Sequence, residues 1–176
     1  TRREMLLAAD RFREVFGVPA VTHGAAGWQM NPAAFACEQE LGFLYASDVR
    51  GFHPFQPVDE HGRPCGVPQL PTTLPTLDEL IGLDDVTADN VDRYLLAQTA
   101  AGKCSHVYTL HAELEGMRLS ETFDRLLLGW RRQDFRLATC RELFDSLDPV
   151  NLPRHRVISG ELAGRSGTLA LQGTAV

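Results

Sequence analysis

Short apolar runs alternate along the chain with longer segments in which apolar residues recur at helical spacing. The runs lie near residues 19–23, 43–46, 67–74, 107–110 and 135–137. Runs of that length are typical of buried strands, and the segments between them predict amphipathic helices. Because strand and helix alternate about five times, we expect an α/β fold of about five βα units around a parallel sheet or barrel.

Polar residues mark the expected ends of these helices. In each of the segments Thr1–Glu4, Thr76–Glu79 and Thr139–Glu142, a threonine is followed three residues later by a glutamate, which is the pattern of a capping box. Asn31 precedes Pro32, and proline is favoured at the first helical position. These signals predict helices that begin near residues 1, 32, 76 and 139.

Composition narrows the class of protein. The chain has 176 residues, which is about one domain, with a formal net charge of −6. A nucleic-acid-binding domain usually has a basic face, so none is expected here. The four cysteines are widely spaced, which argues against a zinc finger and favours free thiols in a reducing compartment. No apolar run approaches the roughly 20 residues that span a bilayer.

Candidate chemistry lies where three of the predicted strands end. Trp28 follows a glycine, where an indole can stack on a sugar or belong to the core. Asp48 can orient a histidine or form a surface ion pair, and Arg50 can bind an anion or pair locally. The carboxyl ends of parallel strands meet at one edge of a sheet, so these side chains are expected to converge.

The third strand end carries the strongest signal. His111 follows the apolar run Val107–Leu110, and Glu113 and Glu115 come directly after it. Histidine transfers protons near neutral pH, so His111 is a candidate general acid. A histidine that is only hydrogen-bonded in a loop is the other interpretation. The remaining histidines are scattered without metal-ligand spacing, and the sequence contains no nucleophile elbow, H-E-x-x-H motif or glycine-rich phosphate loop.

Four ordered blocks resemble the carboxyl-terminal part of NodB-type polysaccharide deacetylases. They are Ala25–Trp28, Tyr45–Gly51, Leu70–Gly82 and Val107–Gly116. Within that family they look most like the enzymes that deformylate 4-deoxy-4-formamido-arabinose carried on undecaprenyl phosphate, in lipid A modification. The resemblance implies a distorted (β/α) barrel, of which residues 1–148 would form the carboxyl-terminal part and residues 149–176 an extension.

The resemblance also implies roles for individual residues. His111 matches the general acid and Asp48 the residue that steadies it. Trp28, Arg50, Glu113 and Glu115 fall in blocks that line the substrate groove. The family holds a divalent metal (zinc, cobalt or manganese) with an aspartate and two histidines. Those motifs have no copy within the chain, so the resemblance implies that they precede residue 1 and that the fragment alone is inactive.

Three functions remain open at this point. The first is a metal-dependent hydrolase that removes an N-formyl group from a lipid-linked aminosugar. The second is a general polysaccharide N-deacetylase, and the third is a non-catalytic module that binds a sugar or lipid phosphate. The expected partner is a lipid-linked or polymeric aminosugar. The expected location is the cytoplasm, with peripheral contact at the inner face of the inner membrane; the sequence leaves the oligomeric state open.

Overall fold

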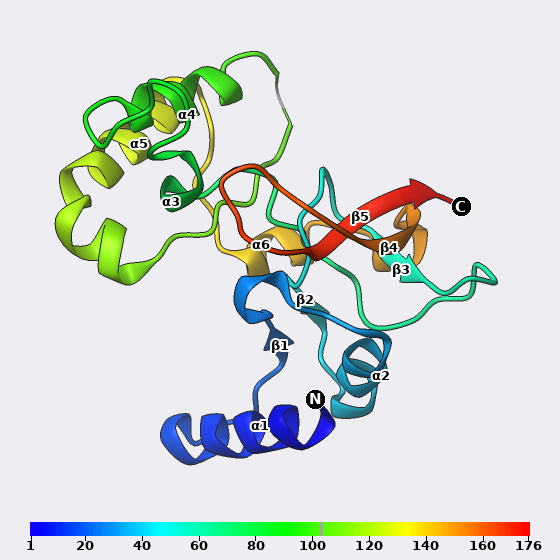
Figure 1. Ribbon diagram of the computed structural model, residues 1–176. Coiled ribbons are helices and arrows are strands. Elements are labelled where there is room, and N and C mark those ends of the chain that lie inside the picture. The colour runs from blue at the N-terminus through cyan, green and yellow to red at the C-terminus, as the bar shows by residue number, and fades with distance from the viewer. Residues whose placement is uncertain (103) are drawn as a thin grey trace.

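The computed structural model describes residues 1–102 and 104–176 as a mixed α/β structure. Figure 1 shows the helices α4 and α5 side by side at one end and the β4–β5 hairpin at the other. The helices are α1 (Arg2–Phe16), α2 (Pro32–Leu41), α3 (Leu77–Leu80), α4 (Val91–Thr99), α5 (Ser120–Arg132) and α6 (Cys140–Asp145). Short helical turns are η1 (Ala26–Trp28), η2 (Leu114–Arg118) and η3 (Pro149–Asn151). The strands are β1 (Thr22–His23), β2 (Tyr45–Ala46), β3 (Gln56–Val58), β4 (Arg154–Gly160) and β5 (Leu169–Ala175).

A row of short parallel segments forms the framework of the site. β1 pairs with β2, and α2 connects them as a βαβ unit. Ala46 of β2 bridges Gln69 in parallel, and the backbone N–H groups of Thr73 and Leu74 donate to the carbonyl of Val107. The order along this row is therefore β1, β2, residues 69–74 and Val107, as expected for consecutive units of an α/β barrel.

The predicted helix ends are largely confirmed. Asn31 accepts from the backbone of Ala34 and caps α2, and Gly42 ends that helix in the left-handed conformation. Thr139 and Glu142 form the predicted capping box of α6. The first predicted capping box is wrong in one respect, because the Thr1 side chain makes no cap hydrogen bond with α1. It accepts instead from the amide of Asn31, which ties the start of α1 to the start of α2.

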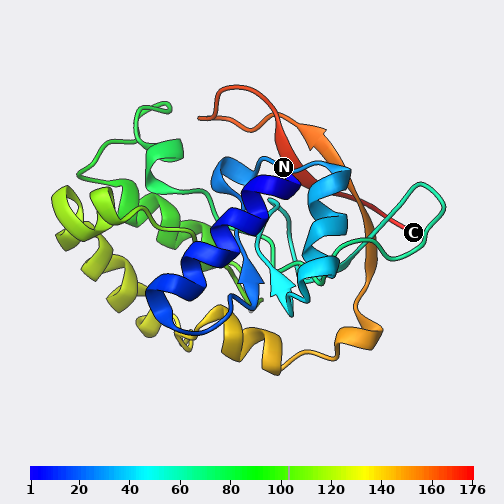
Figure 2. The same ribbon diagram turned by 90° about the horizontal axis from the view of Figure 1, so that it is seen from below.

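Three apolar clusters hold the elements together. The largest joins α3, α4 and α5, where Leu77, Leu95 and Leu126 are fully buried. A second lies between α1, α2 and β2, and Figure 2 shows α1 and α2 side by side from below. The third lies under the β4–β5 hairpin and includes Phe55. At roughly 25 cal/mol per Å² of apolar surface, these clusters are the main stabilising term.

Residues 154–175 form a hairpin that joins the rest of the structure. β4 pairs in parallel with β3 and antiparallel with β5. Arg50 bridges Leu171: its N–H donates to the carbonyl of Ala170, and its carbonyl accepts from Gln172. Gly51 has to be glycine, since a Cβ atom there would lie 2.4 Å from the Gln172 side chain. The hairpin thereby carries the loop 161–168 towards the segment that follows β2.

Two predicted strands are extended segments without a ladder. Among the described residues, the segment Val107–Leu110 makes backbone hydrogen bonds to a neighbouring segment only through Val107. The Val107 N–H donates to the side chain of Thr73, so the backbone pairing does not continue. Residues 135–137 are likewise irregular. Among the described residues, no helix has both the length and the hydropathy that crossing a bilayer requires.

Candidate functional site

The loop after Val107 places His111. Glu115 is 2% exposed, and its carboxylate accepts from the His111 backbone N–H at 3.0 Å and from the Tyr108 hydroxyl at 2.5 Å. Burial, together with the bond to Glu115, raises the pKa of Tyr108 far above its ordinary value, so the hydroxyl stays protonated. Glu115 therefore supports the loop, whereas Glu113 lies on its exposed side.

The imidazole of His111 pairs with Asp78. Its Nδ1 lies 3.1 Å from Asp78 Oδ1, and Asp78 belongs to the first turn of α3. Burial alone would raise the pKa of Asp78, but the nearby Thr76 hydroxyl and the charge of His111 hold it below its ordinary value. Asp78 is therefore ionised near neutrality and fixes the ring through Nδ1, which leaves Nε2 as the nitrogen that can exchange a proton.

Arg165 links this pair to Trp28. Its guanidinium lies 3.5 Å from Asp78 and 3.3 Å from Glu79, and it also lies over the Trp28 ring at 4.7 Å. Arg165 reaches α3 because the preceding residue is Gly164, at φ +80°. A Cβ atom there would lie 2.1 Å from the Glu79 carbonyl oxygen.

Arg50 is a second arginine that pairs with Glu79. Its Nη1 donates to both Glu79 oxygens, at 2.6 and 2.8 Å, and its Nη2 donates to the Leu74 carbonyl. Arg50 is only 8% exposed, and it too lies over the Trp28 ring at 4.7 Å. Trp28 is buried, and its indole N–H donates to Thr72. Arg50 and Trp28 are thus both held inside the protein. The Arg50 Nη1 contacts Glu79, and its Nη2 contacts the Leu74 carbonyl.

These contacts bring several of the predicted residues into one connected group. We call it the His111 network, and it consists of His111, Asp78, Arg165, Trp28, Arg50 and Glu79. A second link runs from Trp28 through Thr72 to Thr109, whose hydroxyl groups are 2.7 Å apart. The convergence expected for Trp28, Arg50 and His111 therefore exists through intervening side chains.

Asp48 lies in a different group. The family resemblance implies that Asp48 steadies His111, but its carboxylate lies 2.7 Å from His23 Nδ1 and accepts from the Ala25 N–H at 2.7 Å. The reason is strand order: β1 and β2 are direct neighbours, so the residues that follow them meet. His111 follows Val107, beside residues 73–74, and the carboxylate that its ring contacts there is Asp78.

Glu38 of α2 completes this second group, the His23 cluster (His23, Glu38 and Asp48). Its Oε1 lies 3.6 Å from His23 Nδ1, and both carboxylates are fully buried. The hydrogen bond to Asp48, and then the proximity of Glu38, raise the pKa of His23 to about 9. Burial raises the pKa of Glu38 to about 8. Burial also works to raise the pKa of Asp48, but its bond to His23 holds it below the ordinary value.

Sequence reasoning missed His23, Glu38, Asp78 and Arg165 as site residues. Asp78 was visible only as part of a helix cap, and Arg165 lies in a segment interpreted as an extension. His23 and Glu38 are brought together by a turn and a helix, so no fixed spacing along the chain reveals them.

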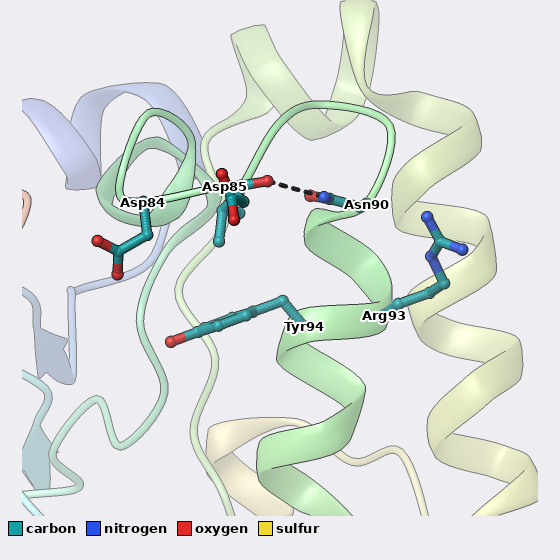
Figure 3. A pocket seen from close by; sticks show the side chains of 6 residues that line it. Asp84, Asp85, Asn90, Arg93 and Tyr94 are labelled. Carbon is teal, nitrogen blue, oxygen red and sulfur yellow. Dashed lines mark hydrogen bonds between the residues drawn. The ribbon is translucent and has the colours of Figure 1, made fainter.

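Two surface pockets are lined by residues outside both groups. One is lined by Asp84, Asp85, Val86, Asn90, Arg93 and Tyr94 at the start of α4 (Figure 3). There Asn90 donates to the Asp85 carbonyl, and Tyr94 lies beneath the loop. A second, of about 640 Å³, lies between α2 and the β4–β5 hairpin and includes Gln29 and Phe35. Neither includes His111, Trp28 or Asp48.

The metal that the family resemblance implies can be compared with the donors present. Within residues 1–102 and 104–176, the His23 cluster is the one group of three or more candidate ligands whose atoms lie within 4.8 Å of one another. It offers one imidazole and two carboxylates, not the aspartate and two histidines of the family. The described residues therefore do not fit the family's ligand set.

Comparisons with known proteins agree with the resemblance. The chain is 32% identical over 161 residues to a "probable 4-deoxy-4-formamido-L-arabinose-phosphoundecaprenol deformylase ArnD" of Shewanella sediminis, covering 91% of this chain and 50% of the relative. It is 26% identical to the protein of the same name from Wigglesworthia glossinidia brevipalpis, covering 94% and 57%. No family model matches the chain.

The fold is shared with a solved structure. The crystal structure of a "putative polysaccharide deacetylase" from Mycobacterium smegmatis superposes with a TM-score of 0.67 at 19% identity, over 92% of this chain and 60% of that one. The chain spans about half the length of the curated relatives it matches. In sequence and in fold, the chain resembles the NodB-type polysaccharide deacetylases and their ArnD deformylase branch, as its four blocks predicted.

Proposed function

We propose that the protein carrying this chain is an aminosugar N-deacylase and that the His111 network supplies its proton donor. The observation that carries the proposal is the His111–Asp78 pair, which fixes the imidazole through Nδ1 at 3.1 Å. The similarity to deformylases over 91% of the chain supports the reaction class.

The chain's own residues have a clear task in such a reaction. Hydrolysis breaks the C–N bond of the amide, gives the hydroxyl of water to the acyl carbon, and requires a proton on the departing amine. His111 would deliver that proton from Nε2 while Asp78 stabilises the imidazolium. Arg165 contacts both Asp78 and the Trp28 ring, and Glu115 accepts from the His111 backbone N–H and holds it in place.

The proposed substrate is a lipid-linked aminosugar with an N-formyl group, as the names of the two curated relatives indicate. A substrate on a lipid carrier would bring the protein to the inner face of the membrane. The N-acetyl group of a polysaccharide is the alternative, and the name of the structural neighbour favours it. Formate release and acetate release distinguish the two.

The test is to incubate the purified protein carrying this chain with N-formyl and N-acetyl aminosugars and to measure formate and acetate. We expect formate release, and a loss of about 10²- to 10⁴-fold for His111→Ala, the range of general acid catalysis. His61→Ala is the matched control, because the His61 side chain is exposed and pairs with its neighbour Glu60, while its backbone N–H, which the substitution keeps, donates to the Asp59 carboxylate. Unchanged turnover in His111→Ala, or sugar binding without acyl release, would contradict the proposal.

A further inference from the structure

We propose that the His23 cluster is a binding site for one divalent cation, formed by residues other than the ligand set of the deacetylase family. The ligands would be His23 Nδ1, Glu38 Oε1 and one Asp48 oxygen. These three atoms already lie within 4.8 Å of one another without a rearrangement of the backbone.

Three different elements fix the ligands independently. His23 ends β1, Glu38 lies on α2, and Asp48 follows β2. The Asp48 carboxylate is oriented by the Ala25 N–H and by the Gln69 amide, at 2.7 and 3.2 Å. In turn, the side-chain amide oxygen of Gln69 accepts from the Asp48 backbone N–H at 3.0 Å. Ligands held in this way by surrounding hydrogen bonds keep their positions when a cation binds.

One oxygen of the cluster has no partner. Glu38 Oε1 is buried and accepts no hydrogen bond, while Glu38 Oε2 has only a long contact of 3.5 Å with Gln69. A buried carboxylate oxygen without a partner is costly, and the usual remedies are a cation or a hydrogen bond. Because Oε1 faces the His23 nitrogen at 3.6 Å, the unsatisfied atom is directed into the cluster.

The lack of a permanent positive charge in the His23 cluster also favours a bound cation. Two fully buried carboxylates face one imidazole, and among the described residues no arginine or lysine forms an ion pair with Glu38 or Asp48. A divalent cation would neutralise both carboxylates at once, and the protons held by His23 and Glu38 would be released to solvent on binding. His23 is 26% exposed at its side chain, so it forms the open side through which an ion can enter. Its ring stacks on Phe43 at 5.9 Å, which holds the ring orientation.

The donor chemistry selects the class of ion. Two carboxylate oxygens and one imidazole nitrogen suit Mn²⁺ or Zn²⁺, and they do not provide the six to eight oxygens that Ca²⁺ prefers. Mn²⁺ is the better probe, since thiolates bind it weakly and the exposed Cys104 lies beside His106, where Zn²⁺ could bind adventitiously.

The experiment is a titration of the metal-free protein with Mn²⁺, followed by loss of the free-ion signal in electron paramagnetic resonance. We expect one saturable site per chain and a rise in thermal midpoint on binding. Glu38→Gln keeps the shape and removes the charge. It should weaken Mn²⁺ binding by more than the roughly 10- to 100-fold that an outer-shell substitution costs. His23→Gln should do the same.

The controls separate the cluster from ordinary surface carboxylates. Glu60→Gln and His61→Gln alter an exposed pair, whose atoms are 3.5 Å apart, with no third ligand. They should leave binding unchanged, and circular dichroism of each metal-free variant verifies the fold. The proposal is overturned if no saturable binding occurs, if Glu38→Gln binds as the unaltered protein does, or if the Glu60 and His61 variants lose binding equally. Because the readout is binding, it is independent of whether the protein hydrolyses an aminosugar.

Discussion

The molecule holds two histidine–aspartate pairs in opposite electrostatic surroundings. In the His111 network, the two carboxylates of Asp78 and Glu79 meet the two guanidinium groups of Arg165 and Arg50. In the His23 cluster, the carboxylates of Asp48 and Glu38 meet a single imidazole and an amide. Both histidines contact an aspartate through Nδ1, yet only the first group has its charges balanced by permanent cations.

The difference indicates what each histidine is suited to do. In the balanced group Asp78 stays ionised, so His111 can give up and regain a proton while its ring remains fixed. In the other group burial raises the pKa of Glu38 to about 8, because no permanent cation offsets its charge. We therefore propose proton transfer for the first pair and cation binding for the second.

The largest expected effect concerns the buried pair of Arg50 and Glu79. Glu79→Gln leaves the Arg50 guanidinium buried without a counter-charge, so we expect the free energy of unfolding to fall by about 3–5 kcal/mol. Glu142→Gln is the matched control, because Glu142 occupies the same capping-box position in α6 but is exposed. Urea unfolding of both variants measures the difference, and equal losses would show that the cap, not the ion pair, is responsible.

A glutamate-to-glutamine substitution in the His23 cluster should have a smaller effect on the free energy of unfolding. In metal-free solution Glu38→Gln removes a buried carboxylate whose Oε1 has no partner, so the loss of unfolding free energy should be within about 1 kcal/mol, or stability should rise. A loss as large as that of Glu79→Gln would contradict the contrast between the two groups.

The smallest expected effect is the contribution of Asp78 to the free energy of unfolding, which depends on pH. Its pKa is lower in the folded protein, so its contribution exists above the ordinary carboxyl pKa of about 3.9 and disappears as pH falls through the lowered value. The groups that face it are His111, Arg165 and Thr76. Because Asp78 is 36% exposed, the contribution should be at most about 1 kcal/mol.

The measurement is chemical unfolding of the unaltered protein and of Asp78→Asn across acidic to neutral pH. The two curves should differ near neutrality and converge in acid. A difference that grows as pH falls would contradict the sign of the pKa shift.

Much of the fold could be predicted from the sequence because local signals carry it. The spacing of Met5, Phe12 and Phe16 predicts α1, and Asn31 with Pro32 predicts the start of α2. Strand predictions were weaker, since pairing depends on distant partners. The run at 107–110 has the right composition for a strand, but the Thr73 side chain takes the Val107 N–H and the ladder stops.

The site was predictable to a lesser degree. His111 and Trp28 follow short apolar runs, and the pattern of these runs predicts strand ends, where sites of parallel sheets form. Which carboxylate each histidine contacts depends on strand order and on the loop that carries Arg165, and neither is encoded by a local motif. For that reason Asp48 was assigned to the wrong histidine, although it does orient one.

The most direct test of two separate histidine–aspartate pairs is the nitrogen-15 spectrum of the imidazole rings in the unaltered protein, Asp78→Asn and Asp48→Asn. Asp78→Asn should shift the ring nitrogens of His111 and leave those of His23 in place, and Asp48→Asn should do the reverse. If Asp48→Asn shifts His111 while Asp78→Asn does not, the division of the molecule into these two groups is contradicted.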